Sequence, residues 1–278
     1  MNDIRVDDLT EPQIHEVMKQ AVTKLSDGVM GRESELITEA EARLKATKKN
    51  RPGCAGVAYI RTEDGQAEVV VETEPAPAAA PAPASANLFA STSVKGTGAN
   101  VENLAEVTFG SFVHPLLKDA YLSHPNPYLN TIGKCAETTM LTKLINQHDP
   151  TLAADFAAAG TDPEQLAALR ERGRQLLSRV EVFTVEPGKP NDPPGTTEHL
   201  EPCSNCSHVV LTYGITALRP NVQGAPDPLI PMTRSEVIDS IRRQSQMLYP
   251  AQQNQEQYAQ AFFNEYGEHL FPENANTQ

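Results

Sequence analysis

Two short segments carry residue types that together could hold a catalytic metal ion. They are Cys135-Ala136-Glu137 and Pro202-Cys203-Ser204-Asn205-Cys206. Three cysteine thiolates can bind zinc and leave its fourth tetrahedral position to water, as in catalytic rather than closed structural sites. A carboxylate two residues from a ligand could then move protons to and from that water. The pattern predicts a Zn²⁺ site formed by Cys135, Cys203 and Cys206, with Glu137 as the catalytic acid and base.

Other interpretations of the same cysteines stay open at this point. A Cys-x-x-Cys pair by itself also occurs in structural zinc modules and redox motifs. A structural site would need a fourth ligand, for which Cys54, His199 and His208 are the candidates. For Cys54 we favour a small buried side chain, because free cysteine is among the most buried residue types.

The segments around the ligands predict an alternation of helices and strands. Apolar residues at helical spacing after Cys135 predict a helix to about Gln147, and the run 203–213, closed by Gly214, predicts a second one. Strands are expected at 180–185, between these helices, and at 215–218. Each ligand group would then lie at the start of a helix, where free amides and the positive dipole end favour thiolate over thiol.

The remaining chain predicts further helices, a hairpin and a low-complexity tract. A turn-rich centre at 63–66 between strands 56–61 and 67–72 is typical of a β-hairpin. The Ala/Pro-rich tract 74–86 favours an extended connector, which we interpret as an insertion within a domain. Helices are expected in two parts of the range from Glu11 to about Lys48, then at 161–177, 235–248 and 252–266.

Composition limits the classes of partner. The formal net charge is −13, with 36 acidic and 23 basic residues, which argues against extended contact with a nucleic-acid backbone. Arg170, Arg172, Arg174 and Arg179 form a basic cluster, which we interpret as a solvated helix face rather than a nucleic-acid groove. The chain lacks an apolar run of about 18 residues, and its first residues lack a secretory signal, so we expect a cytoplasmic protein without membrane contact.

The motif pair resembles that of the YwqJ-like deaminases of the cytidine-deaminase-like superfamily, many of which serve as toxin domains in bacterial conflict systems. The resemblance rests on Gly133-Lys134-Cys135-Ala136-Glu137, on 202–206 and on the following Val209-Val210-Leu211-Thr212-Tyr213-Gly214-Ile215. It implies an α/β fold, a three-layer α-β-α sandwich around a central mixed sheet. The deaminase domain would span 51–225, with the insertion at 74–86, between an N-terminal helical segment at 1–50 and a C-terminal helical extension at 226–278.

The resemblance also implies a reaction and its participants. The expected activity is zinc-dependent hydrolytic deamination of a nucleobase, of cytosine type, within a nucleoside, nucleotide or nucleic acid. The backbones of Ala136 and Glu201 are expected to contact the base. A toxin-type role would bring an immunity protein as partner, and the C-terminal helices could form an oligomer.

Two other functions are compatible with the sequence. One is a standalone deaminase of a small specialised metabolite, which the acidic charge favours over an enzyme acting on long nucleic acids. The other is a non-catalytic interaction protein in which zinc only stabilises the fold. Four protein ligands would support the structural site, whereas three ligands and a water would support the enzyme.

Overall fold

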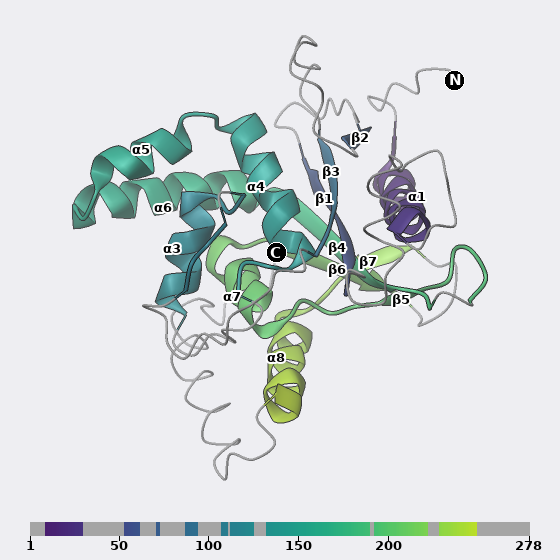
Figure 1. Cartoon of the computed structure of the whole chain (residues 1–278). Coiled ribbons are helices and arrows are strands. Elements are labelled where there is room, and N and C mark those ends of the chain that lie inside the picture. The colour runs from purple at the N-terminus through teal and green to yellow at the C-terminus, as the bar shows by residue number, and fades with distance from the viewer. Residues whose placement is uncertain are drawn as a thin grey trace.

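A central mixed sheet with helices packed against it organises this α/β protein (Figure 1). The computed structural model describes residues 9–29, 53–61, 71–72, 87–93, 107–110, 112–124, 132–189, 192–221 and 228–248. The helices are α1 (Glu11–Val29), α3 (Pro115–Ser123), α4 (Ala136–His148), α5 (Leu152–Ala159), α6 (Pro163–Leu177), α7 (Ser204–Tyr213) and α8 (Arg234–Leu248). The strands are β1 (Ala55–Ile60), β2 (Val71–Glu72), β3 (Leu88–Thr92), β4 (Val180–Pro187), β5 (Thr197–His199), β6 (Thr216–Pro220) and β7 (Leu229–Pro231).

The strands lie in the order β2-β3-β1-β4-β6-β7. Strand β1 pairs antiparallel with β3 on one side and with β4 on the other. Strand β4 continues the sheet in parallel with β6, while its far end pairs antiparallel with the short β5. All six residues of β1 are buried, which is expected for a central strand covered on both faces.

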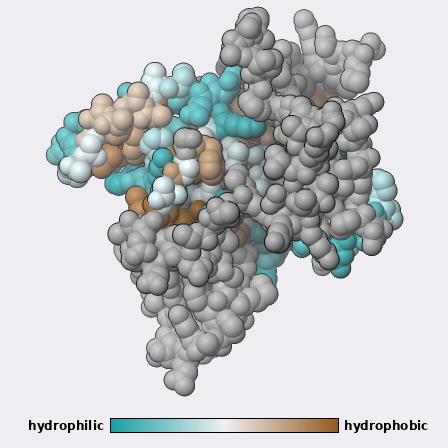
Figure 2. All heavy atoms as spheres, in the orientation of Figure 1, coloured by the Kyte–Doolittle hydropathy of each residue, from teal (hydrophilic) through white to brown (hydrophobic). Residues whose placement is uncertain are grey.

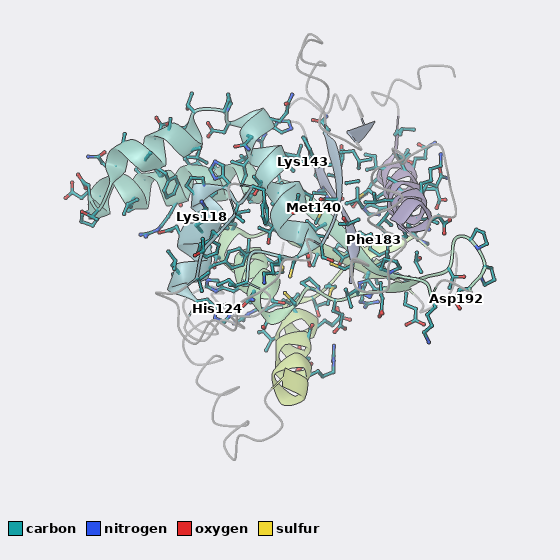
Figure 3. The ribbon with its side chains drawn as sticks, viewed as in Figure 1. Lys118, His124, Met140, Lys143, Phe183 and Asp192 are labelled. Carbon is teal, nitrogen blue, oxygen red and sulfur yellow. The ribbon has the colours of Figure 1, made fainter. Side chains whose placement is uncertain are left out.

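Helices cover the two faces of the sheet unequally. Along β1, Ala58 and Ile60 join the core beneath α3, α4 and α7, whereas Val57 and Tyr59 join the core beneath α1. Figure 3 shows Met140 of α4 on the first side. This alternation follows from the period of two along a strand, and it leaves the first face to the helices that carry the cysteines.

A close approach at Gly56 sets α4 directly on the sheet. A Cβ atom at this position would lie 2.8 Å from Cγ2 of Thr184, 3.2 Å from Sδ of Met140 and 3.3 Å from Cβ of Ala136. Only glycine therefore lets the first turn of α4 pack against β1 and β4 without displacing its neighbours. The start of α4, where Cys135 lies, is held at the sheet by this contact.

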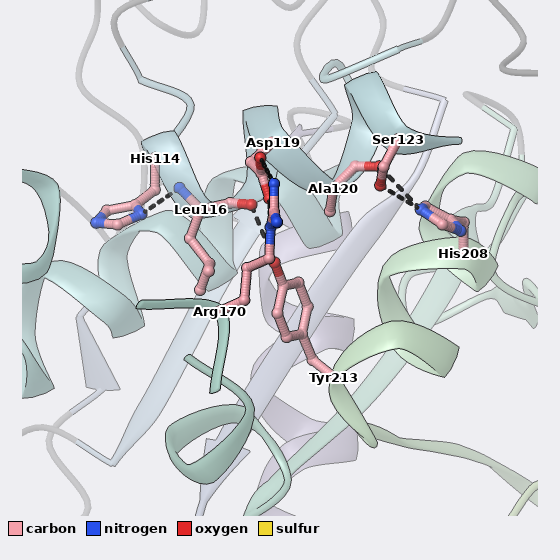
Figure 4. Close-up of polar contacts among 8 residues, drawn as sticks. All are labelled: His114, Leu116, Asp119, Ala120, Ser123, Arg170, His208 and Tyr213. Atoms are coloured by element: carbon pink, nitrogen blue, oxygen red, sulfur yellow. Dashed lines mark hydrogen bonds and ion pairs between the residues drawn. The ribbon is translucent and has the colours of Figure 1, made fainter. Parts of the chain in front are cut away.

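Polar contacts fasten α3 to α6 and α7 (Figure 4). The Asp119 carboxylate accepts two hydrogen bonds from Arg170, at 2.7 and 2.8 Å. The Tyr213 hydroxyl donates to the Leu116 carbonyl at 3.2 Å, and Nε2 of His208 donates to the Ala120 carbonyl at 2.8 Å. Helix α7 is thus tied to α3 at its middle and at its C-terminal end.

The helix and strand predictions that fall on the described residues are largely confirmed. The helices expected at 135–147, 161–177, 203–213 and 235–248 are α4, α6, α7 and α8, and the strands expected at 180–185 and 215–218 are β4 and β6. Gly214 ends α7 with a φ of +69°, in the left-handed region expected of such a glycine. The second N-terminal helix and the helix expected at 252–266 lie outside the described residues.

The predicted β-hairpin between 56–61 and 67–72 is wrong. Strand β1 pairs with β3 and β4 instead, and β2 pairs with β3 in parallel. A fully buried strand needs two neighbours, and the tertiary fold supplies them from later parts of the chain. The strand β3 itself was not predicted, and the Ala/Pro-rich tract, which lies outside the described residues, separates two strands of one sheet.

The surface of the described part carries little large apolar side-chain area. On the face shown in Figure 2, apolar residues gather over α3 and α5, and Leu122 of α3 is 51% exposed. Among the described helices, none combines the length and the apolar character that crossing a membrane requires.

Candidate metal centre

The three predicted ligands meet at the starts of two helices. Cys135 is the N-cap residue of α4, Cys203 is the N-cap residue of α7, and Cys206 lies in the first turn of α7. The Sγ atoms of Cys135 and Cys203 are 3.2 Å apart, and the three sulfur atoms all lie within 4.8 Å of one another. The structure therefore contains a three-cysteine cluster that could hold a metal ion, and the predicted position at helix starts is confirmed.

The surroundings of Cys203 favour its thiolate form. Hydrogen bonds from the Cys135 and Cys206 thiols, together with the backbone amides of Cys206 and Asn205, hold the pKa of Cys203 well below its usual range. Cys135 makes no side-chain cap hydrogen bond to its own helix, so its sulfur atom is available to a cation. Soft thiolate donors of this kind are typical zinc ligands.

The carboxyl group of Glu137 is buried beside the cluster. The residue is 4% exposed, and its Oε2 atom finds no hydrogen-bond partner in the described part of the chain. Burial, and then the charge of Cys203, raise the pKa of Glu137 to about 8. A buried carboxyl with one unused oxygen and a pKa near neutrality suits a group that takes up and releases protons.

Cys54 lies close to the cluster without belonging to it. Its side chain is 7% exposed, as expected for a small buried residue. Burial, followed by the charge of Glu137, raises the pKa of Cys54 to about 12, so that it stays a neutral thiol. Among the described residues, the sulfur group therefore contains three cysteines and not four.

The two histidines considered as ligands make other contacts. Nε2 of His199 donates to the Leu218 carbonyl at 3.2 Å, and its ring stacks on Phe183. His208 donates to Ala120, and burial lowers the pKa of His208 to about 4, so that it stays neutral. Neither histidine joins the cysteine group.

The two residues predicted to contact substrate lie next to the ligands. Ala136 is fully buried in the first turn of α4, and Glu201 precedes Pro202 and Cys203 in the chain. The Glu201 carboxylate is bound by Arg243 of α8, with both oxygens at 2.6 Å. Contact of either backbone with a base stays a prediction.

Sequence reasoning missed the polar residues that support the cluster. The Tyr121 hydroxyl lies 2.6 Å from Oγ1 of Thr138 and so joins α3 to the first turn of α4. The hydroxyl of Ser207 donates to the Pro202 carbonyl at 3.1 Å. The sequence held one usable signal, the polar residues Ser204, Asn205, Ser207 and His208 in the first half of α7. In the structure every residue of α7 except Thr212 is buried.

A second group of metal-type side chains lies on the face of the sheet covered by α1. Its ligand atoms belong to Glu11, His15 and Glu181. Nε2 of His15 lies 3.1 Å from the Glu181 carboxylate, and Arg61 binds the other Glu181 oxygen and lies 3.3 Å from Glu11. The positive charge that these carboxylates need is already supplied by Arg61, so the group acts as an ion-pair network that fastens α1.

Comparisons of the chain with protein-family models, with curated proteins and with solved structures found no match.

Proposed function

We propose that this protein is a zinc-dependent hydrolytic deaminase that acts on an amino-substituted nucleobase of cytosine type. The observation that carries the proposal is the three-cysteine cluster at two helix starts, with the buried Glu137 carboxyl beside it. The order of helix with one ligand, strand, helix with two ligands and strand supports a cytidine-deaminase-like three-layer sandwich, as does the covering of both sheet faces by helices. The sequence resemblance to YwqJ-like deaminases points the same way.

The residues present fit a catalytic zinc ion. Three thiolates would leave one of its four positions to water, whereas a structural site would be closed by a fourth protein ligand. Bound there, zinc would act as a Lewis acid that lowers the pKa of a water molecule and prepares it for attack. The helix starts beneath Cys135 and Cys203 offset part of the negative charge that three thiolates bring to the site.

Glu137 would move the protons of the reaction. Water adds its oxygen to the amine-bearing ring carbon, the carbon–nitrogen bond breaks, and ammonia leaves while a carbonyl remains. The Glu137 carboxylate would take a proton from the attacking water, pass it to the ring nitrogen and later assist the departure of ammonia. Its pKa near 8 means that it can exist in either protonation state close to neutral pH.

Backbone groups beside the ligands would orient the ring. The Ala136 amide and the Glu201 carbonyl lie next to ligands of different helices, so a ring between them would be held from two sides. These contacts are the finer part of the proposal and follow from the family resemblance.

The charge distribution favours a small substrate. On α6, Arg170 pairs with Asp119, Arg172 pairs with Asp149 and Asp155, and Arg174 pairs with Glu171. These arginines are thus engaged by carboxylates, and the chain as a whole carries a net charge of −13. A nucleoside, a nucleotide or a small specialised metabolite fits this balance better than a long nucleic acid does.

A structural zinc site in an interaction protein is the competing function. It would need a fourth protein ligand, and the described residues place only Cys135, Cys203 and Cys206 in the sulfur group. A toxin-type role with an immunity partner, and an oligomer through the C-terminal helices, stay predictions from the sequence.

Ammonia release with identification of the product by mass spectrometry tests the proposal. Zinc-loaded protein would be given nucleosides, nucleotides, single- and double-stranded DNA, and RNA. We expect deamination by the native chain and by the control variant Glu186→Gln, which alters an exposed carboxylate on β4. The variant Glu137→Gln should keep its zinc and lose at least about 100-fold in rate, because general acid–base catalysis contributes factors of that size. Undiminished turnover in Glu137→Gln would refute the role of Glu137.

A further inference from the structure

The last described helix, α8, contacts the segment that presents Cys203. The hydroxyl of Ser240 donates to the Pro202 carbonyl at 3.4 Å, and the hydroxyl of Ser207 donates to the same oxygen at 3.1 Å. Both serines are fully buried. Two separate helices therefore hold the carbonyl of the residue directly before a ligand.

A second contact between α8 and this segment lies at the surface. Arg243 is one turn beyond Ser240 and binds both carboxylate oxygens of Glu201 at 2.6 Å. Glu201 and Pro202 are the two residues before Cys203, and each of them is thus bound by one residue of α8. The spacing of three residues places Ser240 and Arg243 on neighbouring positions of the same helix face.

The start of α8 is itself fixed to the sheet. Thr233 and Glu236 form a capping box, in which Glu236 accepts from the Thr233 amide at 2.7 Å and donates its own amide to the Thr233 hydroxyl at 3.3 Å. Glu236 also binds Arg219 of β6 at 2.8 Å, and the Met232 amide donates to the Ala217 carbonyl at 2.7 Å. These contacts fix α8 relative to β6. Helix α8 in turn contacts Glu201 and Pro202, the two residues before Cys203.

We propose that Ser240 and Arg243 of α8 are positioning residues for the metal ligand Cys203. The N-cap conformation of Cys203, with φ −65° and ψ 165°, directs its Sγ atom toward Cys135. The carbonyl of Pro202 belongs to the peptide unit that enters Cys203, so a shift of this carbonyl changes the direction of that sulfur atom. Mutation of groups that orient the ligands of a metal site commonly lowers metal affinity by about 10- to 100-fold.

Helix α8, in the C-terminal extension, would thus position a metal ligand as well as pack against the rest of the protein. This role rests on the proposed function only in that a metal ion is bound by the three cysteines. Metal affinity can be measured without any turnover, so a chain that binds zinc but deaminates nothing would still test the inference. A chain that binds no zinc would overturn both.

The test is the zinc affinity of Ser240→Ala and Arg243→Ala, measured by competition with a chromophoric chelator. We expect Ser240→Ala to weaken zinc binding about 10-fold, the lower end of the range for such supporting residues. Arg243→Ala should weaken it about fivefold, less than Ser240→Ala because Arg243 is exposed, and Arg243→Lys should recover part of the loss. In cobalt-loaded protein, the sulfur-to-cobalt charge-transfer band should shift in both alanine variants.

Two matched variants separate positioning from general stability. Ser26→Ala removes an equally buried serine whose hydroxyl donates to the Val22 carbonyl at 2.8 Å in α1. Arg170→Ala removes an exposed arginine that also binds a carboxylate through two hydrogen bonds. Both controls should keep native zinc affinity and the native cobalt spectrum. The inference is overturned if the α8 variants bind zinc within about twofold of the native chain, or if the controls weaken binding equally.

Discussion

Two groups of metal-type side chains lie on opposite faces of the same sheet, and they differ in the source of positive charge beside them. Cys135, Cys203 and Cys206 gather at the starts of α4 and α7. Glu11, His15 and Glu181 gather beneath α1 around the guanidinium of Arg61. In each group the ligand atoms lie within 4.8 Å of one another, close enough to hold a metal ion.

The pKa values of the carboxyl groups at the two clusters are shifted in opposite directions. Burial and the charge of Cys203 raise the pKa of Glu137 to about 8. Burial alone would raise the pKa of Glu181, but hydrogen bonds from His15 and Arg61 outweigh it and lower that pKa. The chain therefore balances the negative charge of Glu11 and Glu181 with its own Arg61, whereas the cysteine cluster could take its positive charge from a metal ion.

Loss of a cysteine ligand should have the largest effect on zinc binding. Cys203→Ala is expected to weaken zinc binding by more than about 100-fold, because even supporting residues cost about 10–100-fold. The measurement is the zinc content per chain after dialysis, together with chelator competition.

Cys54→Ala is the matched control for this prediction, because Cys54 is a buried free cysteine near Glu137 outside the cluster. It should retain the native zinc content. Equal zinc loss in Cys54→Ala would mean that the site has four protein ligands and is structural.

Removal of His15 should disturb the second cluster without touching zinc. His15→Ala is expected to lower the free energy of unfolding by roughly 3 kcal/mol, because it removes a buried hydrogen bond to a charged carboxylate. Denaturant unfolding of the variant and of Lys24→Ala, an exposed change on the same helix, measures the difference. A zinc content that fell from two ions to one in His15→Ala would show that the second cluster also binds metal.

The smallest expected effect is the pH dependence of the stability that Glu181 contributes. The folded-state pKa of Glu181 lies below the unfolded value of about 4.3, so its contribution to stability is present above that pH and disappears as the pH falls through the folded value. At pH 7, the free energy of unfolding of Glu181→Gln should be roughly 2 kcal/mol lower than that of the native chain.

This difference should shrink between about pH 4.3 and the lower folded pKa. Denaturant titrations of both chains at pH 7, 5, 4 and 3 provide the comparison. A difference that persisted undiminished at pH 3 would contradict the ion-pair role of Glu181.

The ligand residues and their helices were predictable because their signals are local. The helical stripe after Cys135 and the terminating Gly214 depend on neighbours within a few residues, and α4 and α7 begin and end within about one residue of the prediction. The start of α6, expected at about residue 161, is equally local: the Asp162 carboxylate caps it by accepting from the Glu164 amide at 2.9 Å.

The pairing of strands was not predictable in the same way. The turn-rich residues after β1 suggested a local hairpin, yet β1 pairs with β3 and β4, which are distant in the chain. Strand β3 was not predicted because it is short and follows a low-complexity tract. Pairing of a fully buried strand depends on which partners complete both of its edges, and that choice belongs to the whole sheet.

The amino-acid sequence by itself determined which residues can bind a metal and that they lie at helix starts, because ligand chemistry, capping and helical periodicity act over short distances. Only the tertiary structure decided that Sγ of Cys135 and Sγ of Cys203 come within 3.2 Å of each other, that Arg61 already neutralises the second group, and that α8 contacts Pro202. These contacts join segments far apart in the chain, and they form only when packing against a common sheet brings those segments together.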